Sequence, residues 1–367
     1  MNYAIDSVDV DLALRLVRNA PITSAQVGFR LVLPVESVLC LPGAPEHRLY
    51  PFGLAVAAVN AANRGDLARG AEACDQAILV IQHLGSDSDN RVEQLVSVAR
   101  GARASAIGAW VEAATHLEHA GKLAHDHIHV GYELGTFNRA NAAIAYTMAG
   151  DLVAAESLAE EGLELARRAN APMSIAANLV ALAGALADRD PKRARVLMDE
   201  SLAIHANLNF DNPYDTTQST LIAARLSDWP RVLELGADAI RNLHWSGDRS
   251  FLSGILNVVA RSLVGSDPDS AAILQGAARR LIPFEVFSQS AQYSMRTSTL
   301  SVNTPVSTMA SFLTDLRRAA TAALRASLGD TRLRDLRAQG EAMDYDLIVT
   351  FALDVIGKAH SDSAPSC

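Results

Sequence analysis

Apolar residues along the chain follow helical spacing, and the pattern repeats about every 40 residues. In each repeat, two apolar-periodic segments flank a short turn that carries glycine or aspartate. These turns lie at Gly65-Asp66, Gly108-Ala109, Gly150-Asp151, Asp190-Pro191, Asp228-Trp229 and Asp267-Pro268. Because one helix pair cannot bury its own apolar face, neighbouring pairs must stack. The pattern predicts an all-α fold, a tetratricopeptide-like α-solenoid of about six to seven helix pairs with a concave groove.

The same periodicity predicts the bounds of individual helices. Residues 7–19 have helical spacing that Pro21 should stop, and residues 27–35 form a second apolar segment that Pro34 should end. Asp66 is placed to cap the helix that follows it, since a carboxylate can accept hydrogen bonds from first-turn amides. The predicted helices of the clearest repeats cover residues 52–64, 67–84, 137–149, 152–169 and 173–187.

Breaks in the pattern divide the chain into five parts. Residues 284–314 contain twelve Ser or Thr residues and few charges, which is typical of an irregular segment. Regular helical spacing returns at residue 312. The predicted parts are N-terminal helices with a Pro-rich loop (1–51), helical repeats (52–283), a Ser/Thr-rich irregular insert (284–311), C-terminal closing helices (312–358) and a disordered tail (359–367).

Composition and charge narrow the classes of function. The net charge is −9, and an acidic chain repels phosphate backbones, so direct binding of nucleic acid is not expected. The N-terminal residues are acidic where a signal peptide would be basic, and no apolar run is long enough to span a membrane. Three cysteines without paired spacing favour a reducing compartment, so we expect a cytoplasmic protein.

Several segments resemble one family of regulators. Residues 150–155 (GDLVAA) and 162–166 (GLELA) are similar to the turn and second helix of a tetratricopeptide unit. Three further segments occur in the matching order and spacing, namely 41–66, with Leu41-Pro42-Gly43, Tyr50-Pro51 and Arg64-Gly65-Asp66, then 270–278, and 328–353. The chain thus resembles the C-terminal tetratricopeptide-like helical region of actinobacterial LuxR/MalT-type signal-transduction ATPases, which are adenylate-cyclase/ATPase-like transcriptional regulators.

The chain also departs from that family. It has no G-x-x-x-x-G-K-[ST] run, whose backbone amides would cradle phosphates. It ends in a short polar segment, residues 359–367, where many of these regulators have a helix-turn-helix. The resemblance therefore implies the effector-sensing arm alone, without the cyclase, NTPase or DNA-binding domains. No cofactor and no enzymatic activity are expected.

Polar residues on the first helix of each pair are the candidate binding residues. Asn141, Gln218 and Asn257 each lie ten residues before the turn of their repeat. Asn and Gln at this place in a groove could hydrogen-bond the backbone of an extended peptide, although ordinary polar surface is the alternative. The full candidate set is Asn138, Arg139, Asn141, Asn178, Gln218 and Asn257.

Two other clusters carry possible chemistry. Five of the ten histidines fall between residues 116 and 129, and His125 and His129 have the i, i+4 spacing of a metal site. A solvated loop is the alternative. A second cluster of six arginines is interleaved with aspartates, which favours a salt-bridged surface over a nucleotide-binding patch. These arginines are Arg317, Arg318, Arg325, Arg332, Arg334 and Arg337.

These observations lead to one favoured function and two alternatives. We expect a non-enzymatic regulatory module that binds a protein or a small effector in its concave groove. The partner would be an ATPase, a cyclase or a transcription regulator, and homo-oligomers are also expected because the end of an array can leave apolar surface uncovered. The alternatives are a remnant of a split regulator gene and a metal-dependent hydrolase that uses the histidine cluster.

Overall fold

The computed structural model describes residues 2–27, 34–63, 66–84, 90–124, 131–208, 213–281 and 309–363. All regular secondary structure in these segments is helical, which confirms the predicted all-α class. The first helices are α1 (Asn2–Asp6), α2 (Val10–Val27), α3 (Val35–Leu39), α4 (Tyr50–Asn63), α5 (Leu67–Leu84), α6 (Asn90–Ala106), α7 (Trp110–Ala124), α8 (Gly131–Ala149) and α9 (Leu152–Arg168). They are followed by α10 (Pro172–Leu186), α11 (Pro191–Leu208), α12 (Pro213–Arg225), α13 (Trp229–Ser246), α14 (Arg249–Leu263), α15 (Pro268–Leu281), α17 (Met309–Ala342) and α18 (Tyr345–Ser363).

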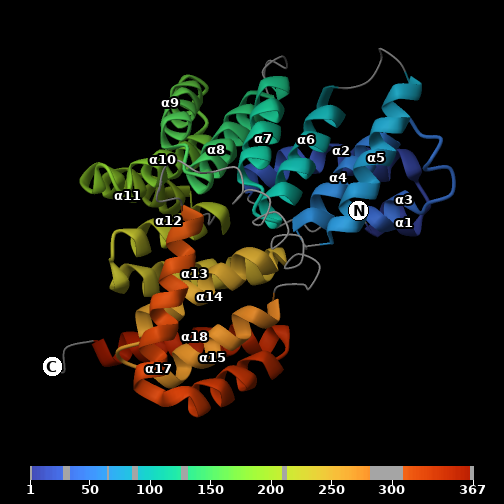
Figure 1. Ribbon diagram of the computed structural model, residues 1–367. Coiled ribbons are helices and arrows are strands. Elements are labelled where there is room, and N and C mark those ends of the chain that lie inside the picture. The colour runs from blue at the N-terminus through green and yellow to red at the C-terminus, as the bar shows by residue number, and fades with distance from the viewer. Residues whose placement is uncertain are drawn as a thin grey trace, which may run out of the picture.

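From α4 to α15 the helices form six successive pairs. Each helix packs against the next one along the chain, and the first helices of most neighbouring pairs also contact each other, as in α8 against α10. Figure 1 shows the succession running from the N-terminal helices through α8–α11 to α12–α18. This order of contacts is consistent with a helical repeat.

Aspartate caps start the second helix of most pairs. The Asp66 carboxylate accepts a hydrogen bond from the backbone N–H of Arg69 at 3.2 Å, which confirms the predicted cap. Each such cap stabilises a helix by about 1 kcal/mol. The same hydrogen bond, from the backbone N–H three residues further along the chain to the aspartate side chain, recurs at Asp151, Asp190, Asp228 and Asp267.

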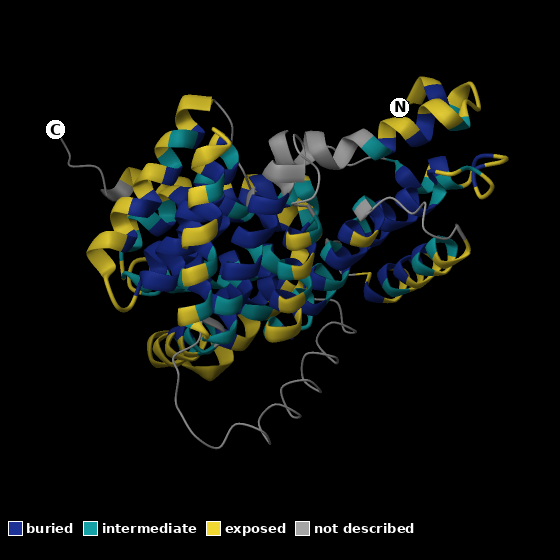
Figure 2. Cartoon of the chain, turned by 90° about the horizontal axis from the view of Figure 1, so that it is seen from above, coloured by how far each residue is buried: buried dark blue, intermediate teal, exposed yellow. Residues whose placement is uncertain are grey.

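The two helices of a pair differ in burial. In α10, twelve of fifteen residues are buried, whereas in α9 only five of seventeen are. First helices are thus enclosed by neighbouring pairs, while second helices present a polar face to solvent. Figure 2 shows this contrast as dark blue interior ribbon and yellow outer helix faces.

Ion pairs join the outer faces of neighbouring second helices. Arg193 of α11 lies 3.2 Å from Glu160 of α9, and Arg167 of α9 lies 3.4 Å from Glu200 of α11. Both pairs join residues 33 positions apart, as do Arg189–Glu156 and Arg195–Asp228. Exposed pairs of this kind each contribute at most about 1 kcal/mol. They show that the outer faces of successive repeats lie side by side.

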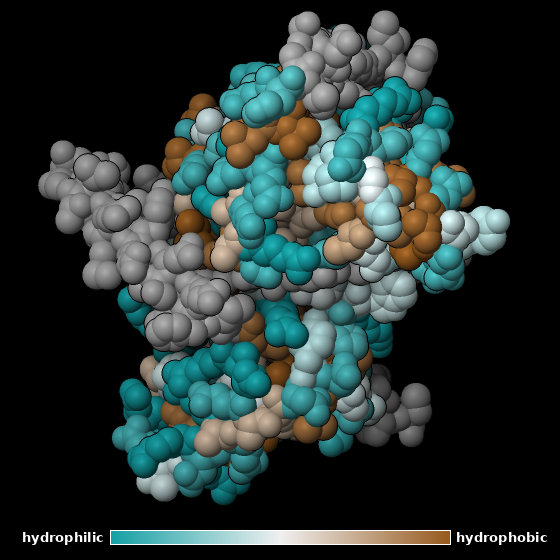
Figure 3. All heavy atoms as spheres, turned by 90° about the vertical axis from the view of Figure 1, so that its right-hand side faces the viewer, coloured by the Kyte–Doolittle hydropathy of each residue, from teal (hydrophilic) through white to brown (hydrophobic). Residues whose placement is uncertain are grey.

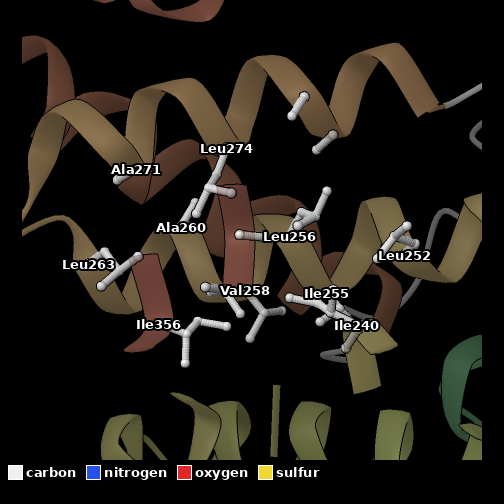
Figure 4. Packing of buried hydrophobic residues seen from close by; sticks show 14 of the residues in the cluster. Ile240, Leu252, Ile255, Leu256, Val258, Ala260, Leu263, Ala271, Leu274 and Ile356 are labelled. Carbon is white, nitrogen blue, oxygen red and sulfur yellow. The ribbon is translucent and has the colours of Figure 1, made fainter. Parts of the chain in front are cut away.

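The largest apolar core surrounds α14. Leu252, Ile255 and Leu256 of this helix are almost completely buried. Figure 4 shows them packed with residues of three other helices. These neighbours include Ile240 of α13, Leu274 of α15 and Ile356 of α18.

The same core also joins helices that are distant in sequence. Met148 of α8 belongs to this cluster, and Trp110 at the start of α7 packs against it. Helix α17 likewise contacts α8. In an ideal solenoid each repeat touches only its neighbours. The array is therefore partly closed on itself by its C-terminal helices.

Near both ends of the chain, the observed helix bounds differ from those that the sequence predicts. Helix α2 continues through Pro21 to Val27, so proline costs it one backbone hydrogen bond without ending it. Pro34 is the residue before helix α3, and residues 28–33 of the predicted second segment lie outside the described residues. At the other end α17 begins at Met309 and α18 extends to Ser363. The rest of the predicted insert, residues 284–308, lies outside the described residues.

A close crossing of α15 and α17 depends on two glycines. A Cβ atom added at Gly276 would lie 2.0 Å from the carbonyl oxygen of Arg337. A Cβ at Gly340 would lie 2.0 Å from the carbonyl oxygen of Ile273. Backbone atoms cannot move away as a side chain could, so any larger residue at either position must separate the two helices.

We expect Gly276→Ala to destabilise the fold by several kcal/mol, because the steric clash with backbone exceeds the gain of about 1 kcal/mol in helix propensity. Gly254 of α14 is the matched control, since a Cβ there meets nothing within 4 Å. Gly254→Ala should raise the melting temperature slightly. Thermal unfolding followed by circular dichroism compares the two, and an unchanged melting temperature for Gly276→Ala would contradict this crossing.

Candidate functional site

The six candidate binding residues lie on the first helices of four successive pairs. Asn138, Arg139 and Asn141 are on α8. Asn178 is on α10, Gln218 on α12 and Asn257 on α14. Asn141 and Asn257 are partly exposed, whereas the other four are buried. The candidate set thus divides into two residues that solvent reaches and four that are enclosed.

Arg139 is occupied by contacts inside the fold. Its Nη1 atom donates to the carbonyl oxygens of Gly121 at 3.2 Å and Gly135 at 3.4 Å. Its Nε atom lies 3.3 Å from a carboxylate oxygen of Glu161. The side chain therefore joins α7, α8 and α9, and its charge is already balanced.

Asn178 holds two first helices together. It is fully buried, and its Nδ2 atom donates to the carbonyl oxygens of Thr136 on α8 at 3.1 Å and Ser174 at 2.8 Å. Gly162 of α9 makes room for it, because a Cβ there would lie 2.1 Å from Asn178 Oδ1. The side chain of Asn257 is hydrogen-bonded within its own helix, since its Nδ2 atom donates to the Ser253 carbonyl oxygen at 2.9 Å.

Helix α12 carries a run of enclosed polar residues, of which the sequence prediction included only Gln218. All six residues from Asp215 to Thr220 are buried, with Gln218 among them. Among the described residues, the Ser219 hydroxyl has no hydrogen-bond partner, and on α8 the Asn138 Nδ2 atom has none either. The sequence DTTQST inside a helical segment was the available signal, because a polar run interrupts the apolar stripe there.

A buried His–Asp pair lies at one end of this polar run. The Nε2 atom of His205 on α11 is 2.8 Å from Oδ2 of Asp215, and both residues are at least 95% buried. The other ring nitrogen of His205 has no partner. The sequence prediction missed this pair because ten residues separate its members along the chain, and only the contact of α11 with α12 brings them together.

The predicted metal residues His125 and His129 lie outside the described residues. Two other histidines of the cluster are described. His119 lies 3.3 Å from Glu93, and burial lowers the pKa of His116 despite the nearby Glu112 carboxylate. Within the described segments, no group of three or more His, Cys, Asp or Glu residues is arranged to hold a metal ion.

Asp248 is a buried carboxyl group with a displaced pKa. It caps α14 by accepting from the Phe251 N–H at 3.0 Å. Burial raises its pKa to about 6, while hydrogen bonds from Phe251, Ser250 and Tyr214 act in the opposite direction. The same burial raises the pKa of Tyr214 well above its usual value.

Large apolar side chains are exposed at several separate places. Four of those exposed in the described residues belong to the N-terminal sixteen residues, namely Tyr3, Val8, Leu12 and Leu16. Trp245 and Leu347 are exposed elsewhere, on α13 and α18. In Figure 3 the apolar groups visible on one side of the molecule are interrupted by hydrophilic side chains.

Comparison with known proteins found no protein-family model that matches this chain and no match among characterised proteins. Among the described helices, none is long and apolar enough to cross a membrane.

A double-mutant cycle distinguishes a packing role of Asn178 from a ligand-binding role. We expect Gly162→Ala to destabilise the protein by about 1–3 kcal/mol, because the added methyl group collides with the buried amide. In an Asn178→Ala background the same change should cost much less, because the space is vacated. Urea denaturation of the four proteins measures the coupling, and additive effects would contradict this packing.

Asp248→Asn should change how stability depends on pH. A native pKa of about 6 against a reference value of 3.8 means that the folded state holds the proton more tightly, so this group's contribution to the free energy of unfolding falls as pH rises from about 4 to 6. Asparagine still caps the helix but cannot ionise.

The variant should therefore gain stability relative to the wild type with rising pH, by up to about 3 kcal/mol at pH 7. Urea denaturation at several pH values between 4 and 7 measures this difference. A constant difference across that range would show that Asp248 does not titrate as its burial implies.

Proposed function

We propose that the chain is a non-enzymatic, cytoplasmic regulatory module that binds a protein partner or a small effector on the face formed by its first helices. In this proposal the helix pairs form a tetratricopeptide-like α-solenoid, and the chain acts like the effector-sensing arm of a LuxR-type ATPase regulator. The partner would be a separate ATPase, cyclase or transcription regulator.

The observation that carries the proposal is the polar character of the enclosed first helices. Unsatisfied buried polar groups cost about 1–3 kcal/mol each, so native proteins contain few of them. Here Asn138 Nδ2 and Ser219 Oγ are both unpaired and buried, and they belong to the first helices α8 and α12. A bound ligand would recover part of that cost if it supplied the missing partners.

The outer face is a poorer candidate for this role. Its arginines are paired with carboxylates of the neighbouring second helix, as in Arg193–Glu160 and Arg167–Glu200. Neutralised pairs offer little net charge to a partner. The partly exposed residues Asn141 and Asn257 on the first helices are the more accessible recognition groups.

The test is affinity capture from the native host lysate with the tagged full chain, read by mass spectrometry. We expect a stoichiometric partner that an Asn141→Ala/Asn257→Ala double variant captures at least about tenfold less, because a lost polar contact typically costs one or two kcal/mol. Lys192→Ala, an exposed change on the second helix α11, is the matched control.

Both variants change partly or fully exposed positions, so circular dichroism should show unchanged helicity. Capture that is equal for the double variant and the wild type would exclude these residues from recognition. If no protein is enriched, and no small molecule raises the melting temperature of the chain, the proposal fails as a whole.

A further inference from the structure

The two halves of α17 fold back on each other at Gly329. This residue has φ 74° and ψ 165°, which no helix contains. Thr321 and Arg337 lie eight residues before and after it, and their side chains are joined by a hydrogen bond of 2.8 Å. In a straight helix, sixteen residues would span about 24 Å. The fold-back thus brings both halves together against α15.

Three polar side chains meet where these helical segments touch. Arg337 donates through Nη2 to Oε1 of Gln275 and to the hydroxyl oxygen of Thr321. Gln275 is only 3% exposed, and in the part of the chain that the structure describes its Nε2 atom has no hydrogen-bond partner. The Nε atom of Arg337 has none either. The cluster therefore contains two buried N–H groups that lack acceptors.

Charge in this region is unevenly balanced. The predicted salt-bridged surface is confirmed for Arg318, Arg325 and Arg332, which pair with Asp315, Asp330 and Asp269. Arg279 pairs with Glu341 at 3.3 Å. Within the described part of the chain, Arg337 forms no ion pair with a carboxylate.

The surroundings of Arg337 add positive charge. Burial, together with the guanidinium groups of Arg279, Arg325 and Arg317, lowers its pKa, and the Glu341 carboxylate opposes this. A half-buried cation without a counter-ion is unfavourable, because it loses hydration without gaining an opposite charge. Arg337 remains partly open to solvent, which leaves an approach for a small anion.

We propose that Arg337, Gln275 and Thr321 form a binding site for the phosphate group of a small molecule. The guanidinium fork and the unpaired amide supply donors, and a phosphate group supplies three strong acceptor oxygens. Its charge of nearly −2 would balance the guanidinium of Arg337 and the nearby charge of Arg317 better than the single charge of a carboxylate, whereas Arg279 and Arg325 are already paired with Glu341 and Asp330. The site lies on α15 and α17, outside the first-helix residues of the proposed function, so the two ideas stand or fall separately.

The first measurement is the melting temperature and the calorimetric affinity of the full chain during titration with inorganic phosphate and, separately, AMP. Potassium chloride at matched ionic strength is the reference. We expect a saturable rise in melting temperature with at least one phosphate compound and none with chloride. Binding of phosphate alone would indicate a free anion as the ligand, and binding of AMP alone would indicate a larger phosphate ester. No saturable effect of either overturns the proposal.

Variants then assign the effect to the cluster. Arg337→Gln should weaken binding at least about tenfold, because it removes the charged hydrogen-bond donors. Arg318→Gln is the control, since Arg318 is on the same helix, exposed and paired with Asp315. It should retain the affinity of the wild type, and equal binding by Arg337→Gln would overturn the assignment.

A second variant covers the case in which Arg337→Gln does not fold. Arg325→Gln changes an exposed residue whose charge acts on Arg337, so the fold should be retained. It should weaken binding severalfold and make the affinity less dependent on salt concentration. An affinity and salt dependence identical to those of the wild type would also overturn the proposal.

Discussion

Enclosure of the first helices is the constraint on which the rest of the structure depends. Helix α10 is buried along most of its length, so it can exist only with α8, α9, α11 and α12 around it. The alanines and glycines of these helices let the backbones approach closely enough for such packing. Second helices cover only one side of the array and can carry charge on the other.

Polar residues inside this enclosure have to be satisfied by the fold or by something else. The amide nitrogen of Asn178 and the guanidinium of Arg139 donate to backbone carbonyls of neighbouring helices, and so they fix how the pairs are oriented, although Asn178 Oδ1 has no partner among the described residues. Asn138, Ser219 and the second nitrogen of His205 are not used in this way. Residues whose polar groups are hydrogen-bonded within the fold build the scaffold, whereas those with unpaired groups are the candidates for ligand binding. A list of polar residues from the sequence does not show this difference.

The C-terminal helices show how one local feature has wide effects. Gly329 reverses the direction of α17, and Gly276 lets its returning half lie directly on α15. As a result Arg337 reaches Gln275 and Thr321, whereas Arg318, Arg325 and Arg332 of the same series pair with aspartates. The same helix also contacts α8, which an open array of repeats would not allow.

Local signals in the sequence were sufficient for much of this architecture. The apolar period, the turn glycines and the capping aspartates predicted α5 at Leu67–Leu84 and the helical class, because these features act within a few residues. They also placed all six candidate residues on first helices. They were insufficient at Pro21, where a helix tolerates one lost hydrogen bond.

What only the tertiary structure decided is which polar side chains remain unpaired. Burial of Asn178, the contact of His205 with Asp215 and the isolation of Arg337 from carboxylates all depend on residues from different helices. Helical spacing specifies the face of a helix on which a residue lies, but not the partner that lies opposite. The sequence by itself therefore determined the repeated helix pairs, whereas packing between the pairs decided the chemistry of the sites.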